Sequence, residues 1–319
     1  MGDLVLDVRG NLGLKPEVIG YLASIKEDDC NYIYYNIRHP MGTFNIALGF
    51  VINDLIELLI ELEEIQEKYG NYDNYKKMEL NIKLKNLLID LFKFRDSLYH
   101  VLLGCCKKHN PPSKNEPIHE WLKKNKYLAG KELHSEINNY LKYFNIINNK
   151  LKHTSSTIEN IYFHTKDSAI MGFYVTGIDN NGSIGPDEMI HPKINGEYSA
   201  SSYNFLLKEI YYVIYKISFS FRNVLIKHFV DVYNMDLKFN SNCNKEDKKE
   251  RELFYRMRKL PDTYFPNEFG KLTHEFKLEN NKFYLLEKPA ETIDLKGYQI
   301  ICMFAPDGIS RKFTLPYKR

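Results

Sequence analysis

Two segments of the chain place an arginine, a small polar residue and a histidine at nearly the same spacing. These segments are R-D-S-L-Y-H, with Arg95, Asp96 and His100, and R-N-V-L-I-K-H, with Arg222, Asn223 and His228. A guanidinium group binds phosphate through paired hydrogen bonds and stabilises the charge that develops on it. An imidazole transfers protons near neutral pH. Together these groups supply what cleavage of an RNA backbone requires when no metal takes part.

Long helices are expected to carry both segments. Apolar residues recur at steps of three and four over residues 43–68, 73–107, 131–153 and 202–233, which is the period of an amphipathic helix. We expect these four helices to form one antiparallel, up-down bundle. The first segment lies on the second of these helices, and the second segment lies on the last.

The remaining chain predicts smaller elements around this bundle. Residues 157–200 contain β-type runs separated by turn sequences such as D-N-N-G, so a small β insertion is expected there. Residues 1–42 indicate an irregular N-terminal segment, and 251–319 predict a small mixed α/β or β-rich tail domain. The predicted fold class is therefore mainly α: a multi-helix bundle over 43–233 with a β insertion and a C-terminal α/β tail.

The first segment does not bring its own arginine and histidine to one face of an ideal helix. Measured from Leu91 on the apolar stripe, Arg95 lies at about 40° and His100 at about 180° for a rotation of 100° per residue. Either the long arginine side chain reaches around the helix, or a second chain supplies the opposing half of a site. The structural alternative is a solvated His100 and an Arg95 at the edge of the bundle.

The second segment and the end of the third helix have plainer interpretations beside the functional one. His228 continues an apolar stripe, as a hydrogen-bonded core histidine would, and its helix is apolar on other faces too. That helix needs cover from a dimer interface or from the tail. Lys152 and His153 end the third helix, where cations complement the helix dipole, or they line an RNA path beside the main site.

Composition restricts the class of protein. A hydrophobic content of 44% with 27% charged residues is typical of a soluble globular protein, and the net charge of +3 provides no global field for nucleic acid. Five cysteines, without a C-x-x-C pair, indicate a reducing cytoplasm and neither a disulfide framework nor a zinc site. Residues 43–68 are apolar enough to resemble a membrane span. Asn53, Asp54 and Glu57 interrupt them, so we expect a buried helix and no membrane contact.

Long helices, together with an arginine, a polar residue and a histidine after four to six residues, resemble the HEPN family (higher eukaryotes and prokaryotes nucleotide-binding domain). The resemblance covers about residues 43–233. Many members are metal-independent ribonucleases of toxin–antitoxin and phage-defence systems, and they work as dimers with paired motifs at the interface. The resemblance implies a cytoplasmic bacterial endoribonuclease with RNA as substrate, no cofactor and no metal. It also implies a homodimer, and an antitoxin or other defence-system protein as partner.

Carried over to this sequence, the family motif assigns roles to particular residues. Arg95 would orient or stabilise the scissile phosphate, His100 would transfer protons, and Asp96 would position one of them. The alternative catalytic set is Arg222, Asn223 and His228. The β insertion and the two motif copies depart from the simple family pattern and leave the choice between the sets open. Family members without nuclease activity exist, so a non-catalytic helical interaction or regulatory subunit is the alternative function.

Two further patterns suggest metal chemistry. Pro261-Asp262 followed by Glu275-Phe276-Lys277 resembles the PD-(D/E)xK nucleases, in which carboxylates hold Mg²⁺ and a lysine assists the attacking water. The sequence around Glu275 and Lys277 alternates like a strand, which would place both on one face. Separately, the cluster Asp187, Glu188 and His191 either holds a metal or forms a turn with solvated carboxylates. The flanking prolines favour the turn.

Overall fold

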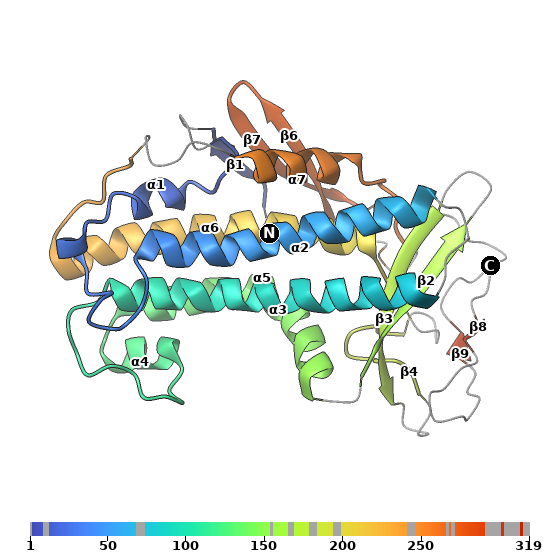
Figure 1. The fold of residues 1–319 in the computed structure, drawn as a ribbon, viewed down its shortest axis with the longest axis horizontal. Coiled ribbons are helices and arrows are strands. Elements are labelled where there is room, and N and C mark those ends of the chain that lie inside the picture. The colour runs from blue at the N-terminus through green and yellow to red at the C-terminus, as the bar shows by residue number, and fades with distance from the viewer. Residues whose placement is uncertain are drawn as a thin grey trace.

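Four long helices form the centre of the molecule, and smaller elements surround them (Figure 1). The computed structural model describes residues 2–8, 13–67, 74–153, 156–164, 169–178, 184–193, 199–240, 247–265, 268, 272–290, 301–302 and 313–314. The elements within these ranges are β1 (Leu4–Asp7), α1 (Val18–Leu22), the 3-10 turn η2 (Glu27–Asp29), α2 (Pro40–Glu67), α3 (Asn74–Gly104), α4 (Ile118–Lys124), α5 (Leu128–His153), β2 (Ile158–His164), β3 (Ala169–Ile178), β4 (Ile184–Pro186), β5 (Ser201–Ser202), α6 (Tyr203–Tyr233), α7 (Lys248–Lys259), β6 (Leu272–Glu279), β7 (Lys282–Pro289), β8 (Ile301–Cys302) and β9 (Phe313–Thr314).

Helices α2, α3, α5 and α6 run alternately up and down and share one apolar core (Figure 1). Helix α3 packs against α2 and α5, and α5 packs against α6. Phe44 of α2 joins three of these helices, because its ring lies 5.4 Å from that of Phe94 and 6.2 Å from that of Phe221. The predicted bundle is confirmed, and its helices have nearly the expected bounds.

The ends of these helices follow local chemistry. Helix α2 begins at Pro40, a residue that suits the first position of a helix, and therefore starts before Thr43, where the apolar period begins. Ser202 caps α6, since its hydroxyl accepts a hydrogen bond from the Phe205 backbone N–H at 3.2 Å. Asn234 ends the same helix in the left-handed conformation, with φ of 52°.

Helix α2 is long and apolar enough, over Pro40–Ile65, to cross a membrane by length and composition. It is the one such helix in the part of the chain that the structure describes, and half of this stretch is buried inside the protein. Phe44, Val51, Leu55 and Leu59 on its inner face have no exposed surface and belong to the shared core. In this structure α2 packs as a core helix of the bundle.

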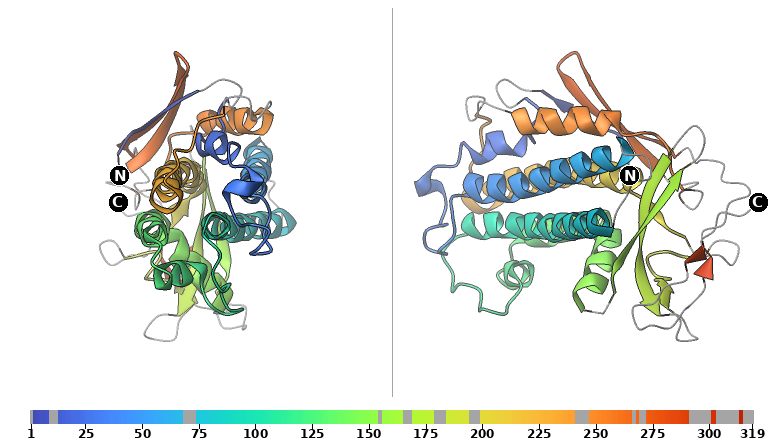
Figure 2. Two further views of the ribbon diagram at one scale, coloured as in Figure 1. Left: turned by 90° about the vertical axis from the view of Figure 1, so that its left-hand side faces the viewer. Right: turned by 45° about the vertical axis from the view of Figure 1, so that its right-hand side comes forward.

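The β elements form an insertion and a covering sheet. Strands β2, β3 and β4 follow α5 and precede α6 along the chain, and they form an antiparallel sheet in which β5 also pairs with β3. The small β insertion that the sequence predicts over 157–200 is therefore confirmed. A second sheet has the order β1-β7-β6 and lies beside α6 (Figure 2). Strand β1 comes from the N-terminal segment that the sequence indicates as irregular, and its Leu4 and Leu6 lie opposite Leu285 and Phe283.

This second sheet, which contains strands from the tail, covers part of the surface of α6. Helix α6 contacts α5, α1, β3 and β6, so it is buried on most of its faces within one chain. Tyr211 of α6 packs edge-on against Phe276 of β6, with ring centroids 4.8 Å apart. The described part of the tail therefore shares the core of the bundle, because helix α7 and strands β6 and β7 extend that core.

Candidate active site

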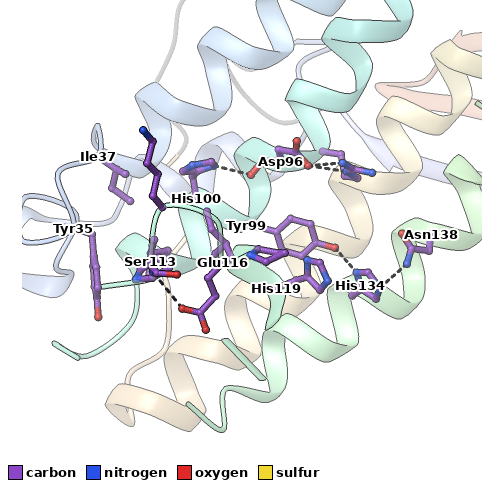
Figure 3. A pocket seen from close by; sticks show the side chains of 16 residues that line it. Tyr35, Ile37, Asp96, Tyr99, His100, Ser113, Glu116, His119, His134 and Asn138 are labelled. Atoms are coloured by element: carbon purple, nitrogen blue, oxygen red, sulfur yellow. Dashed lines mark hydrogen bonds and ion pairs between the residues drawn. The ribbon is translucent and has the colours of Figure 1, made fainter. Parts of the chain in front are cut away.

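A cavity of about 560 Å³ opens where α3, α4 and α5 meet the loop between α3 and α4 (Figure 3). The first Arg/His segment lies on its wall. The lining residues are Tyr35, Ile37, Arg95, Asp96, Tyr99, His100, Leu103, Pro112, Ser113, Lys114, Glu116, Pro117, Ile118, His119, His134 and Asn138. Three histidines from three different helices thus surround one space.

Arg95 and Asp96 form an ion pair on this wall of the cavity. The Arg95 Nε–H donates to Oδ1 of Asp96 at 2.8 Å, and a terminal guanidinium nitrogen lies 2.7 Å from the same oxygen. The guanidinium also lies over the Phe92 ring, 4.8 Å from its centroid. The arginine side chain therefore lies against Phe92 and Asp96 of its own helix, and one chain brings Arg95 and His100 to the same cavity.

His100 is held from its own helix. Its Nδ1 lies 2.9 Å from the Asp96 backbone carbonyl oxygen, so Nδ1 carries the proton and donates it to that bond. Among the described residues, Nε2 of the same ring has no hydrogen-bond partner. Asp96 positions both functional groups, because its carboxylate holds Arg95 and its carbonyl oxygen holds His100.

His119 and His134 face each other across α4 and α5 in nearly parallel planes, with ring centroids 4.4 Å apart and an interplanar angle of 10° (Figure 3). The His134 Nδ1 lies 3.1 Å from the Tyr99 hydroxyl, and its Nε2 accepts from the Asn138 amide at 2.7 Å. Burial, with the nearby positive charge of His119, lowers the pKa of His134. His134 is thus neutral and held by two hydrogen bonds, and its ring stacks on that of His119. The side chain of His119 remains 28% exposed.

A close approach of α4 to α5 makes this stacking possible. Gly130 of α5 faces Leu122 of α4, and a Cβ at position 130 would lie 2.6 Å from the Leu122 Cβ. Trp121 of α4 is buried and donates from Nε1 to the Asn110 carbonyl oxygen at 2.9 Å. Trp121 therefore anchors this short helix to the loop between α3 and α4. The anchor also fixes the loop that lines the cavity.

Four charged side chains line the cavity in addition to the three histidines. Arg95 and Lys114 are its cations, and Asp96 and Glu116 are its carboxylates. Asp96 is engaged by Arg95, and Glu116 pairs with Lys124 outside the cavity at 3.6 Å. Among the described residues, no group of three or more His, Cys, Asp or Glu side chains is arranged to hold a metal ion.

The second Arg/His segment has a similar contact between its arginine and the next residue, but its histidine lies in the core. Arg222 donates from Nε to the Asn223 side-chain oxygen at 3.1 Å and also forms an ion pair with Glu17. His228 is 2% exposed, and its Nε2 lies 2.9 Å from the Cys105 carbonyl oxygen. Burial lowers the pKa of His228. The structure places His228 as a buried, hydrogen-bonded residue.

Lys152 and His153 lie far from the cavity. Both are exposed in the last turn of α5, and His153 lines a separate shallow pocket with Lys150 and Met189. They stand about 28 Å along the helix from His134, at 1.5 Å per residue. The structure therefore does not bring these two residues together with the first segment.

The cluster Asp187, Glu188 and His191 forms a turn, but not the solvated one that the sequence favours. Asp187 is 5% exposed and pairs with Lys150 at 2.7 Å, because the turn packs against the end of α5. The His191 Nε2 accepts a hydrogen bond from the Val175 backbone N–H at 2.9 Å. Both side chains are thus committed to protein contacts.

The structure brings together the residues of the tail pattern that resembles the PD-(D/E)xK nucleases. Glu275 and Lys277 share one face of β6, 3.2 Å apart, and Asp262 lines the same cavity of about 240 Å³. Although burial raises the pKa of the Asp262 carboxyl, hydrogen bonds from Lys208 and Lys288 lower it to about 2. Two ammonium groups therefore already neutralise the carboxylate that would have to bind Mg²⁺.

Sequence reasoning did not identify His119 and His134. They come from separate helices, 15 positions apart, and no short motif joins them. The one indication in the sequence is their position: His119 lies in α4 and His134 near the start of α5, the two helices that directly follow α3.

Comparison of the chain with models of protein families, with curated proteins and with solved structures gives no match in any of the three.

Proposed function

We propose that the cavity lined by Arg95, His100 and His119 is the active site of a metal-independent endoribonuclease. The observation that carries the proposal is that one chain gathers an arginine, a lysine and three imidazoles around a single cavity. A phosphodiester needs cationic groups for its oxygens and two proton-transfer groups for its attacking and leaving oxygens. These residues provide both.

The roles follow from the contacts of each side chain. The free Nε2 of neutral His100 takes the proton from a ribose 2′-hydroxyl, and that oxygen then forms a bond to phosphorus. The bond from phosphorus to the 5′-oxygen breaks, and protonated His119 donates a proton to that oxygen. Arg95, oriented by Asp96, stabilises the negative charge on the phosphoryl oxygens, with Lys114 beside it. The products are a 2′,3′-cyclic phosphate and a 5′-hydroxyl.

The sequence resemblance to HEPN ribonucleases supports the same chemistry and adds a biological setting. It favours a role in a bacterial toxin–antitoxin or phage-defence system, in the cytoplasm, with a protein partner that controls the nuclease. The helical bundle agrees with this setting, and the first of the two segments is the one exposed to a substrate-sized cavity.

The rates of single variants test the proposal. We expect Arg95→Ala and His100→Ala to lower cleavage of a labelled RNA by about 10²-fold or more, the usual scale for such groups. His119→Ala should act similarly, whereas His134→Ala should lower the rate less and alter its pH profile. The matched control is His153→Ala, an exposed histidine outside the cavity, which should leave the rate unchanged.

Two outcomes would support other functions. If cleavage requires Mg²⁺ and disappears in Glu275→Ala, the tail cavity with Asp262 and Lys277 is the nuclease. If no RNA is cleaved under any condition and His100→Ala behaves like the wild type in cells, the chain is a non-catalytic interaction subunit. Equal loss of activity in His100→Ala and His153→Ala would also contradict the proposed site.

A further inference from the structure

A second cavity, of about 570 Å³, lies between α5, α6 and the strands β6 and β7. Figure 2 shows this sheet on the α5–α6 side of the bundle. Ligand cavities for small molecules usually have volumes of about 300–1,000 Å³, so this space is large enough for one. None of its lining residues belongs to the Arg/His cavity, although α5 contributes to both.

The walls of this cavity are rich in aromatic rings. Tyr140, Tyr143 and Phe144 come from α5, and Phe205 comes from the first turn of α6. Phe144 and Phe205 are buried, and the two tyrosines are half-buried. Aromatic faces carry partial negative charge and attract cations as well as apolar groups.

Two carboxylates, Glu209 and Glu287, line the same walls. Oε2 of Glu209 lies 2.7 Å from Nε2 of His274, and the side chain of Glu209 is 18% exposed. Among the described residues, the other oxygen, Oε1, has no hydrogen-bond partner. The histidine therefore fixes the carboxylate and leaves one oxygen for a ligand.

His274 is an unusual wall residue. Its side chain is 2% exposed, and it stacks on Tyr212 with ring centroids 3.9 Å apart and an angle of 4°. Its Nδ1 is buried, and within the described part of the chain no hydrogen-bond partner is found for it. A buried polar atom without a partner is costly, and His274 lines both this cavity and the tail cavity of about 240 Å³.

We propose that this cavity binds a small amphipathic organic cation, with an aromatic or branched apolar body and a primary amine or guanidinium group. The apolar body packs against Tyr140, Tyr143 and Phe205. The cationic group donates to Glu209, with Glu287 adding a second negative charge. Lys142 is the one cation among the lining residues, and its side chain is exposed. Charge complementarity thus selects a positive ligand.

Calorimetric titration with three ligands of nearly equal shape tests this directly. We expect 2-phenylethylamine to bind the wild-type protein at least about tenfold more tightly than neutral 2-phenylethanol, since hydrogen bonds to charged groups are the stronger ones. Anionic phenylacetate should not bind. Equal affinity for all three ligands, or no heat from the amine up to about 10 mM, would overturn the proposal.

Variants locate the binding. Glu287→Gln keeps the side-chain shape and should weaken amine binding by about fivefold to tenfold. Glu209→Gln should weaken it more, and its folding is checked by thermal unfolding because it also removes the partner of His274. Glu57→Gln makes the same charge change on α2, which does not line the cavity, and should bind like the wild type. Unchanged affinity in folded Glu287→Gln and Glu209→Gln would place the amine elsewhere. The result is independent of RNA cleavage.

Discussion

His100 and His228 end similar sequence segments, yet their surroundings differ completely. His100 lines an open cavity with one ring nitrogen held by a carbonyl oxygen and the other facing no described partner. His228 is 2% exposed and bonded to the Cys105 carbonyl oxygen. The spacing of residue types selected both histidines, and the neighbouring elements decide which of them meets solvent.

We predict that His228→Ala lowers the free energy of unfolding by about 1–3 kcal/mol, because it opens a gap in the core and removes a buried hydrogen bond. Urea unfolding at neutral pH measures this change. The matched control, His153→Ala, is exposed and should stay within about 0.5 kcal/mol of the wild type. A His228→Ala protein as stable as the wild type would show that the histidine has no structural role.

The sequence was sufficient to group Arg95, Asp96 and His100, because these three lie within six consecutive positions of one helix, and all three line one cavity, while their catalytic role stays a prediction. It was insufficient for the stacked pair His119 and His134. Their contact depends on how closely two helices approach, and a glycine at the crossing is the one local trace of it. The orientation of the arginine was left open for a related reason: its long side chain can bridge two helix faces.

At the scale of single elements, α4 is the helix whose position matters most for the site. It carries His119, and Gly130 lets it approach α5.

Helices α2 and α3 carry two carboxyl groups that affect each other's charge. Asp54 of α2 and Asp90 of α3 carry carboxyl groups that interact, and burial of Asp54 together with the negative charge of Asp90 raises the pKa of Asp54 to about 7.

We predict that Gly130→Ala impairs cleavage by about tenfold or more, because the added methyl group pushes α4 and His119 away from α5. The intrinsic helix preference changes in the opposite direction, since alanine favours a helix by about 1 kcal/mol over glycine. Steady-state cleavage rates and thermal unfolding of the same samples separate the two effects. A fully active Gly130→Ala protein would mean that the position of α4 does not matter for the reaction.

A further prediction concerns the carboxyl pair. The pKa of Asp54 in the folded protein lies above the value of about 3.9 for an unfolded chain, so the folded state binds more protons between about pH 4 and pH 7. This contribution to stability falls as the pH rises through that window. Asp54→Asn should therefore be more stable than the wild type at about pH 8, by about 1–2 kcal/mol after allowance for partial solvent screening, and equal to it near about pH 4. Urea titrations at the two pH values measure this, with Asp28→Asn, which changes an exposed carboxyl outside the four bundle helices, as the control. An equal gain at both pH values would exclude titration of Asp54 as the cause.

Over the whole molecule, local sequence patterns were enough to predict the fold class: helical periodicity predicted the bundle, and β-type runs and turn sequences predicted the β insertion. The local pattern was also enough to predict a mixed tail. It was not enough to show that β1 pairs with β7, because residues 4–7 and 282–285 contact each other across nearly the full chain. Neither strand indicates its partner through local sequence. This pairing joins the N-terminal segment to the tail, and the core of the tail is continuous with that of the bundle.

The resemblance to dimeric ribonucleases leads us to expect a homodimer, although one chain already gathers the residues of the cavity. Ile46 and Phe50 are exposed one turn apart on α2, at 42% and 52%. Multi-angle light scattering at micromolar concentration should give twice the chain mass, and Phe50→Glu should shift it toward the monomer if this face takes part. A strict monomer in the absence of ligand would contradict the expected assembly.

The ends of the RNA fragments produced in the presence of EDTA test the central claim most directly. In the proposed mechanism the 2′-hydroxyl attacks phosphorus, so we expect cleavage without a metal that leaves 2′,3′-cyclic phosphate and 5′-hydroxyl ends, and we expect these ends to be absent with His100→Ala. Fragments with 3′-hydroxyl and 5′-phosphate ends, formed only with Mg²⁺ and unaffected by His100→Ala, would contradict it.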